Sequence, residues 1–226
     1  MKLTYYGHAC FAVDAGGTIL LFDPFITENP LAKKIDINQV KADFILVSHG
    51  HGDHVADLVA VAKRTRATVI APFEVGSWFE KKGVENVQAM NHGGTARLPF
   101  GTVKLTAAIH SSSMPDGSYG GNPCGFVVES AGGSFYYSGD TALTMDMKLI
   151  GEFSKLDFAV LPIGDFFTMG ITDAVRAAEL VGVRKIVGVH YDTFAPIKLD
   201  HAAALKCAEA GGKELLLPKI GETIEI

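Results

Sequence analysis

The segment from His49 to His54 carries three imidazole side chains and one carboxylate within six residues, and it follows an apolar run at residues 44–47. Turn chemistry needs glycines, but it does not require alternating histidines followed by an aspartate and a further histidine. Gly50 and Gly52 allow the backbone to bend sharply enough to present four ligands from six residues. The segment therefore predicts a metal site rather than a polar surface turn.

Candidate ligands outside this segment also follow predicted buried strands. Asp23, His49, His110, Asp140 and His190 each stand just past the carboxyl end of an apolar run. In α/β proteins, ligands and catalytic groups gather at these strand ends. A lone histidine in such a place is more often a hydrogen-bonded core residue. Five residues of this kind indicate a common site.

Three of the histidines can serve one metal ion. His49 and His51 are two residues apart in an extended stretch, so both rings should point the same way. With His110 they offer three nitrogen donors.

A second ion can be held by the remaining ligands. Asp53 and His54 leave the turn in another direction and can join His190. Asp140 has two carboxylate oxygens, which suits a bridge between cations about 3.5–4 Å apart.

The elements that must position these residues alternate between strands and helices after a β-rich beginning. The order, repeated coarsely in two halves of the chain, predicts the α/β class with a four-layer αββα sandwich of two mixed β-sheets and helices outside. Strands are expected at residues 2–6, 10–14, 18–23, 44–47, 67–71, 84–90, 96–100, 102–109, 125–129, 134–138, 158–163 and 185–189, with strand, turn and strand at 214–226. Helices are expected at residues 55–63, 73–82 and 173–181, the last capped by Thr172, and from Asp200 to before Gly211.

Length and composition place the chain among ordinary globular proteins. Its 226 residues are best interpreted as one domain, 1–226, with 48% hydrophobic and 20% charged residues. The net charge of −5 and the lack of a basic stripe argue against a nucleic-acid partner. Neither a signal peptide nor an apolar run of about 20 residues is evident, so no membrane partner is expected. Three widely spaced cysteines favour a reducing compartment, and we expect a cytoplasmic protein that can form a homo-oligomer.

The ligand pattern as a whole resembles the metallo-β-lactamase superfamily, which carries His-x-His-x-Asp-His followed by isolated His, Asp and His. The segments at residues 6–11 (YGHACF) and 21–24 (LFDP) are similar to the branch that contains ascorbate-phosphate lactonases and N-acyl phosphatidylethanolamine phospholipase D. Within that branch the whole chain resembles compact metal-dependent hydrolases. The resemblance implies the metallo-β-lactamase fold, and it implies the same division of ligands between two metals, with Asp140 bridging and Asp23 holding the histidine turn.

The chemistry expected from such a site is metal-dependent hydrolysis. Two divalent ions lower the pKa of a shared water towards neutral, and the resulting hydroxide attacks a carbonyl or phosphorus centre. Zinc is the first choice of metal, with manganese, iron, cobalt or nickel also compatible. Asp53 and Asp140 are the expected catalytic carboxylates. The expected substrate is a small molecule with an ester, lactone or phosphodiester bond.

Several further residues are weaker candidates. His8 stands in a glycine turn and can contact substrate or assist proton transfer, although a structural role is nearly as compatible with its position. Residues 165–169 follow a buried strand and can form a pocket wall, with Asp165 or Thr168 touching substrate, unless they only pack within their loop. The loop at 111–123 can form a lid, and residues 191–193 can line the same cavity. His92 and His201 have no place in the ligand pattern.

Two other classes remain open. A mono-iron persulfide dioxygenase-like oxidoreductase keeps a similar turn, whereas di-iron proteins that reduce oxygen or NO replace the histidine at position 51 by glutamate. A non-catalytic metal-binding protein is the other alternative, and the intact ligand set argues against it. Among hydrolases, no cysteine stands at a ligand position as in many zinc β-lactamases. The added basic arm of the tRNA endonucleases and the helical C-terminal domain of the glyoxalase-type thioesterases are also missing.

Overall fold

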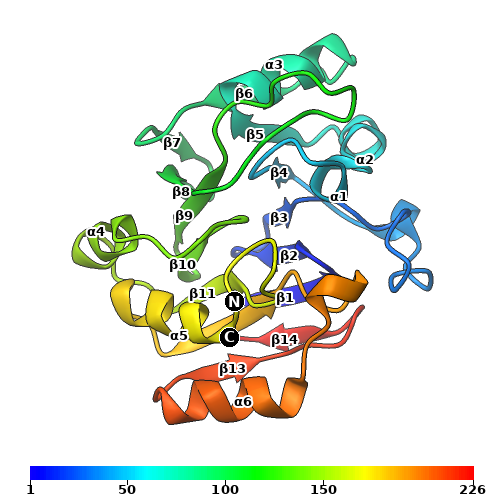
Figure 1. Cartoon of the computed structure of the whole chain (residues 1–226). Coiled ribbons are helices and arrows are strands. Elements are labelled where there is room, and N and C mark those ends of the chain that lie inside the picture. Colours follow the sequence, from blue (N-terminus) through cyan, green and yellow to red (C-terminus); the bar gives the residue numbers. More distant parts are fainter.

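Two seven-stranded β-sheets form the centre of the protein in a computed structural model that describes residues 1–226 (Figure 1). The first sheet has the strand order β14-β1-β2-β3-β4-β5-β6, and the second has the order β13-β12-β11-β10-β9-β8-β7. The first sheet consists of β1 (Lys2–Gly7), β2 (Cys10–Asp14), β3 (Ile19–Phe22), β4 (Phe44–Leu46), β5 (Thr68–Pro72), β6 (Val87–Met90) and β14 (Thr223–Glu225). The second consists of β7 (Thr95–Leu98), β8 (Gly101–Ala107), β9 (Cys124–Ser130), β10 (Gly133–Tyr137), β11 (Phe158–Pro162), β12 (Lys185–Val189) and β13 (Glu214–Leu216).

Each sheet changes from antiparallel to parallel pairing along its width. In the first sheet β1, β2 and β3 pair antiparallel, and β3, β4, β5 and β6 pair parallel. In the second, β7 to β10 pair antiparallel, and β10 to β13 pair parallel. Short turns can join antiparallel neighbours, whereas parallel neighbours need crossover segments, and here helices supply most of these. The repeat of this order confirms the expected two-half arrangement.

The helices lie on the outer faces of both sheets. They are α1 (Gly52–Val55), α2 (Leu58–Thr65), α3 (Phe73–Lys81), α4 (Asp146–Phe153), α5 (Ile171–Leu180) and α6 (His201–Ala210), with short 3₁₀ helices η1 (Ile37–Gln39) and η2 (Ala195–Ile197). Three apolar clusters separate the layers: one between the two sheets, one under α2 and α3, and one under α4 to α6. The four-layer αββα sandwich is therefore confirmed.

Three expectations about helices were wrong in detail. The helix expected at residues 55–63 is two helices, because α1 begins at Gly52 and the chain breaks before α2. Gly170, not Thr172, is the residue before the first turn of α5. The third is α4, which was not predicted: its N-cap residue, Met145, makes no side-chain hydrogen bond, and Gly151 lies in the helix interior.

Cys10 and Cys124 are buried, Cys207 is half-buried, and all three are free thiols. None of the helices combines the length and the apolar character that a bilayer span requires.

Candidate metal centre

The strand-end residues expected from the sequence share one edge of the molecule. Asp23 and His190 come one residue after β3 and β12. His49, His110 and Asp140 come three residues after β4, β8 and β10. In the first sheet, β3 and β4 run parallel, and in the second β10 to β12 do so. The strand β8 runs in the same direction as β10, because both are antiparallel to β9. Their carboxyl ends therefore meet at one site.

His49, His51 and His110 form the first ligand group, with one nitrogen of each ring within 4.8 Å of the others. The Nε2 atom of His49 lies 2.9 Å from Nδ1 of His51. Nitrogens that bind one tetrahedral zinc ion at 2.0–2.1 Å stand about 3.3 Å apart, so this spacing is close to that of a shared ion. His49 is fully buried, whereas the other two rings are partly exposed.

A buried hydrogen-bond network sets which nitrogen of His49 faces this group. The Ser48 hydroxyl donates to Oδ2 of Asp23 at 2.6 Å and lies 2.9 Å from Nδ1 of His49. Since the hydroxyl proton is used on Asp23, the serine oxygen accepts from Nδ1–H of His49. The lone pair of His49 Nε2 is then free to bind a metal ion.

The same carboxylate orients His54. Its Nδ1 lies 2.9 Å from Oδ2 of Asp23, and its Nε2 lies 3.3 Å from Oδ2 of Asp140. Asp23 also accepts from the Tyr137 hydroxyl at 2.5 Å and from the backbone N–H of Ser48 at 2.8 Å. Asp23 thus lies behind both ligand groups and fixes their imidazoles, the arrangement that metal-binding histidines usually require.

Asp53, His54 and His190 form the second ligand group; together with His8 they place one ligand atom each within 4.8 Å of the others, and Asp140 adjoins them. Oδ2 of Asp140 lies 2.9 Å from Nε2 of His190, 3.3 Å from that of His54 and 3.7 Å from that of His110. Since His110 belongs to the first group, one carboxylate oxygen faces both groups. Asp140 is 3% exposed and stands between them.

The electrostatics of the metal-free site leave negative charge without a permanent cation. Every ion pair of Asp23, Asp53 and Asp140 is with a histidine, and none is with lysine or arginine. Burial opposes ionisation of Asp140, but His190 and His54 hold its pKa well below the usual range. A buried carboxylate among imidazoles alone is the charge arrangement that a divalent cation completes.

The protonation of the histidines differs between the two groups. Burial, followed by the neighbouring imidazoles, lowers the pKa of His49, and burial also lowers the pKa of His51 and His110. Burial acts in the same direction on His54, but Asp140 and Asp23 outweigh it and raise its pKa well above the usual value. Moreover, Nε2 of His54 is buried and makes no hydrogen bond, although it lies 3.3 Å from Oδ2 of Asp140. An unsatisfied buried nitrogen that faces a carboxylate beside neutral imidazoles fits metal ligation.

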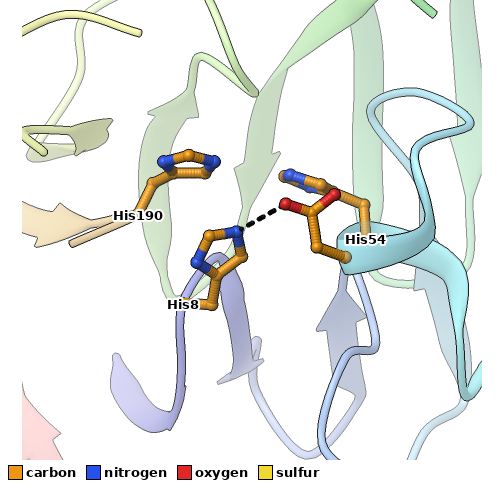
Figure 2. A group of neighbouring side chains, drawn as sticks. His8, His54 and His190 are labelled. Carbon is orange, nitrogen blue, oxygen red and sulfur yellow. Dashed lines mark hydrogen bonds and ion pairs between the residues drawn. The ribbon is translucent and has the colours of Figure 1, made fainter. Parts of the chain in front are cut away.

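His8 lies next to the second group. Its Nε2 is 3.1 Å from Oδ2 of Asp53, the contact drawn as a dashed line in Figure 2, and its Nδ1 is 3.0 Å from the Thr193 hydroxyl. Figure 2 also shows the rings of His8, His54 and His190 turned towards one another, and a nitrogen of each lies within 4.8 Å of the others. The side chain of His8 is fully buried, and its Nε2 contacts the partly exposed carboxylate of Asp53.

Strained backbone marks the same region. Seven non-glycine residues have positive φ, and His8, Asp23 and His190 are among them, with φ of 55°, 40° and 57°. Left-handed conformations cost non-glycine residues about 1–3 kcal/mol and persist where the surroundings determine them. No local sequence pattern predicted these left-handed conformations.

A cavity of about 570 Å³ opens onto the ligands. It is lined by His51, Asp53, His110, Ser111, Asp140, Phe167, His190, Phe194 and Pro196. Its volume suits a small substrate. Hollows of about 660 and 600 Å³ lie elsewhere, beside α2 and between β8 and α4, and neither contains a group of metal ligands.

The weaker candidates from the sequence have other neighbours. Asp165 accepts from the N–H of Phe166, Thr168 bonds the carbonyl of Met169, and neither lines the cavity. From the loop at 111–123, Ser111 reaches the cavity.

The remaining candidates are held by local contacts. Tyr191 is buried, and Thr193 contacts His8. His92 reaches the carbonyl of Pro123 at 2.8 Å, and His201 pairs with Asp192 at 2.7 Å. Of the pocket wall expected at residues 165–169, Phe167 lines the cavity. Tyr137 and Phe194 were not predicted from the sequence, and for Phe194 the signal was an aromatic residue in a short loop after a ligand-bearing strand.

Comparison with known proteins agrees with this architecture. Residues 18–191 match the family model described as "Beta-lactamase superfamily domain". A "UPF0173 metal-dependent hydrolase" from Flavobacterium johnsoniae is 51% identical over 226 residues, which is 100% of both chains. A metallo hydrolase from the archaeon Ignicoccus hospitalis superposes with a TM-score of 0.88 at 35% identity, over 99% of this chain and 97% of that chain. A diiron β-hydroxylase from Streptomyces venezuelae shares the fold at 14% identity, with a TM-score of 0.76 over 100% of this chain and 54% of that one.

Proposed function

The chain belongs to the metallo-β-lactamase superfamily and, within it, to the UPF0173 metal-dependent hydrolases, and from this premise we propose that it is a dinuclear enzyme that cleaves ester, lactone or phosphodiester bonds of small molecules. The observation that carries the dinuclear proposal is the position of Asp140. One of its oxygens lies within 3.7 Å of nitrogens from both ligand groups. A carboxylate in that position suits a bridge between two ions.

The first ligand group would hold one ion, and the second group would hold another, with Asp140 shared. Bound there, two divalent ions would lower the pKa of a water molecule towards neutral and polarise the bond under attack. The nitrogen and oxygen donors fit zinc first, and manganese, iron, cobalt or nickel as alternatives.

Asp53 has the geometry to orient a nucleophilic water. Its carboxylate is partly exposed to the cavity, while His8 holds Oδ2 from behind. A neutral His8 can donate Nε2–H to Asp53, while its Nδ1 faces the Thr193 hydroxyl, which also lies 3.3 Å from the carbonyl oxygen of Tyr191. We assign His8 to positioning Asp53, with no direct contact to substrate.

Turnover after defined metal loading tests this function. The protein is stripped of metal, loaded with zinc, manganese, iron, cobalt or nickel, and assayed on lactones, phosphodiesters, thioesters and β-lactams. We expect activity that saturates at two equivalents of metal and falls at least about 10²-fold in Asp140→Ala. Asp173→Ala, on the exposed side of α5, is the control and should retain full activity.

Two results would contradict the proposal. Full activity at one equivalent, or in Asp140→Ala, would exclude the bridged pair. Oxygen consumption by the iron form without hydrolysis would instead support the oxidoreductase alternative.

A further inference from the structure

The residues that line the cavity indicate a narrower class of substrate than the one in the proposed function. This inference rests on that proposed function. We infer that the substrates are uncharged carboxylic esters or lactones whose apolar substituent binds between Phe167 and Phe194. These two residues are called the aromatic walls below.

The first wall belongs to a loop between β11 and α5 that holds aromatic side chains away from the core. Phe166 and Phe167 are 72% and 50% exposed, and their rings pack edge to face with centroids 4.8 Å apart. Asp165 and Phe166 have φ of 60° and 58°, a conformation that is rare for a bulky side chain. Adjacent exposed phenylalanines on strained backbone indicate a binding surface, because neither burial nor local preference explains them.

The base of this loop is fixed to the ligand residues. Gly164 and Gly170 form an isolated β-bridge that closes the loop. The N–H of Met169 donates to the carbonyl of Thr141, the residue after Asp140, at 3.0 Å. A Cβ at Gly164 would stand 2.1 Å from the carbonyl oxygen of His190, so the loop is packed directly on that ligand. The base of the loop that carries Phe167 is therefore anchored to the ligand residues.

The second wall is equally well anchored. The ring of Phe194 packs edge-on against His8, with centroids 5.4 Å apart. The N–H of Ile197 donates to the carbonyl of Phe194 at 3.1 Å, and Ile197 is fully buried. Pro196 completes this side of the cavity.

No lysine or arginine lines the cavity, and its polar residues are the proposed ligands and Ser111. A phosphate or carboxylate placed away from the bond under attack would lie against the partly exposed rings of Phe167 and Phe194 without a counter-charge. Removing water from an unpaired charge is unfavourable, whereas each buried methylene favours binding. An uncharged apolar substituent therefore fits the aromatic walls, and a distal anion does not.

Binding of alkyl hydroxamates to the zinc-loaded protein tests the inference without turnover, because the hydroxamate occupies the metals and the alkyl chain samples the walls. Acetohydroxamate, butanohydroxamate and hexanohydroxamate are titrated calorimetrically. Each added methylene should tighten binding up to about fourfold. A six-carbon hydroxamate that ends in a carboxylate should bind at least about tenfold more weakly than hexanohydroxamate.

Variants test which residues bind the alkyl chain of the hydroxamate. Phe167→Ala and Phe194→Ala should each weaken hexanohydroxamate about tenfold while leaving acetohydroxamate unchanged, and Phe167→Leu should recover most of the loss. Phe153→Ala, which removes a phenylalanine that is 83% exposed on α4, should change neither affinity.

The inference would be overturned by a hydroxamate affinity that does not depend on the length of the alkyl chain. Equal affinity for hexanohydroxamate and the carboxylate-terminated hydroxamate would overturn it as well. Failure of all hydroxamates to bind would overturn both the inference and the proposed metal site. Chain-length-dependent binding by a protein that hydrolyses no substrate of the panel would support the inference and contradict the proposed reaction instead.

Discussion

Replacement of Asp23 by asparagine tests how the buried carboxylate supports the metal centre. Asp23 is fully buried and accepts four hydrogen bonds, from the Ser48 hydroxyl and N–H, the Tyr137 hydroxyl and Nδ1 of His54. Asparagine keeps the shape but removes the charge and turns one acceptor into a donor. Hydroxyl protons must then reorganise, and His54 loses the partner that sets its tautomer.

The expected cost is large compared with the stability of a typical domain. Breaking a buried charged pair by changing one partner costs about 3–5 kcal/mol, and domains are stable by about 5–15 kcal/mol. Metal affinity should fall about 10–100-fold, because second-sphere carboxylates orient the ligating imidazoles. Urea denaturation of the metal-free protein measures the first quantity, and competition with a chromophoric chelator measures the second.

Two variants separate these effects. Tyr137→Phe removes one hydrogen bond to the carboxylate and should cost about 1.5–3 kcal/mol with a smaller loss of metal affinity. Asp57→Asn alters another buried carboxylate, which accepts from the N–H groups of Ile26 and Thr27 and the Thr27 hydroxyl and contacts no proposed ligand. It should lower stability and leave metal affinity unchanged. Unchanged metal affinity in Asp23→Asn, or an equal loss in Asp57→Asn, would refute the reasoning.

Three further predictions concern protons and backbone. At pH 7.5, binding of metal to the second ligand group should release about one proton, from His54 with its raised pKa. Binding of metal to the first ligand group should release almost none, because the lowered pKa values of its histidines keep them neutral. Calorimetry in buffers of different ionisation enthalpy measures both releases, and equal proton release at the two groups would contradict the assignment. Burial, followed by nearby His190, lowers the pKa of His8 to about 4, below its value near 6.5 in the unfolded chain, so the unfolded chain binds the extra proton. As the pH falls from 6.5 to 4, the metal-free protein should therefore lose up to about 3 kcal/mol of unfolding free energy relative to His8→Gln. Urea denaturation measures both free energies, and the same dependence on pH in the two proteins would disprove the prediction. Gly139→Ala should lower the free energy of unfolding by at least about 2 kcal/mol, because φ is 61° and a Cβ would stand 2.5 Å from a backbone carbonyl oxygen. Gly182→Ala, where φ is 78° and no atom lies close to the added Cβ, should lower it by about 1 kcal/mol. Thermal or urea unfolding measures both changes.

Local patterns predicted the elements with strong signals and missed those without them. Continuous apolar runs such as residues 158–163 predicted buried strands because parallel strands covered on both faces need apolar side chains throughout. The helix α4 was missed because Met145 provides no side-chain cap and because Gly151 interrupts a helix of only eight residues.

Sequence alone determined the fold class and the set of residues gathered at one edge of the sheets. Strand direction follows from the order of elements, and the carboxyl ends of like-directed strands must meet, so the order of elements already places His110 and His190 beside the histidine turn. Tertiary structure alone decided the partners of those residues. Tyr137 reaches Asp23 across 114 positions, and His8 reaches Asp53 across 45. Contacts of this kind depend on sheet register, twist and left-handed backbone at single residues, which no local sequence pattern encodes.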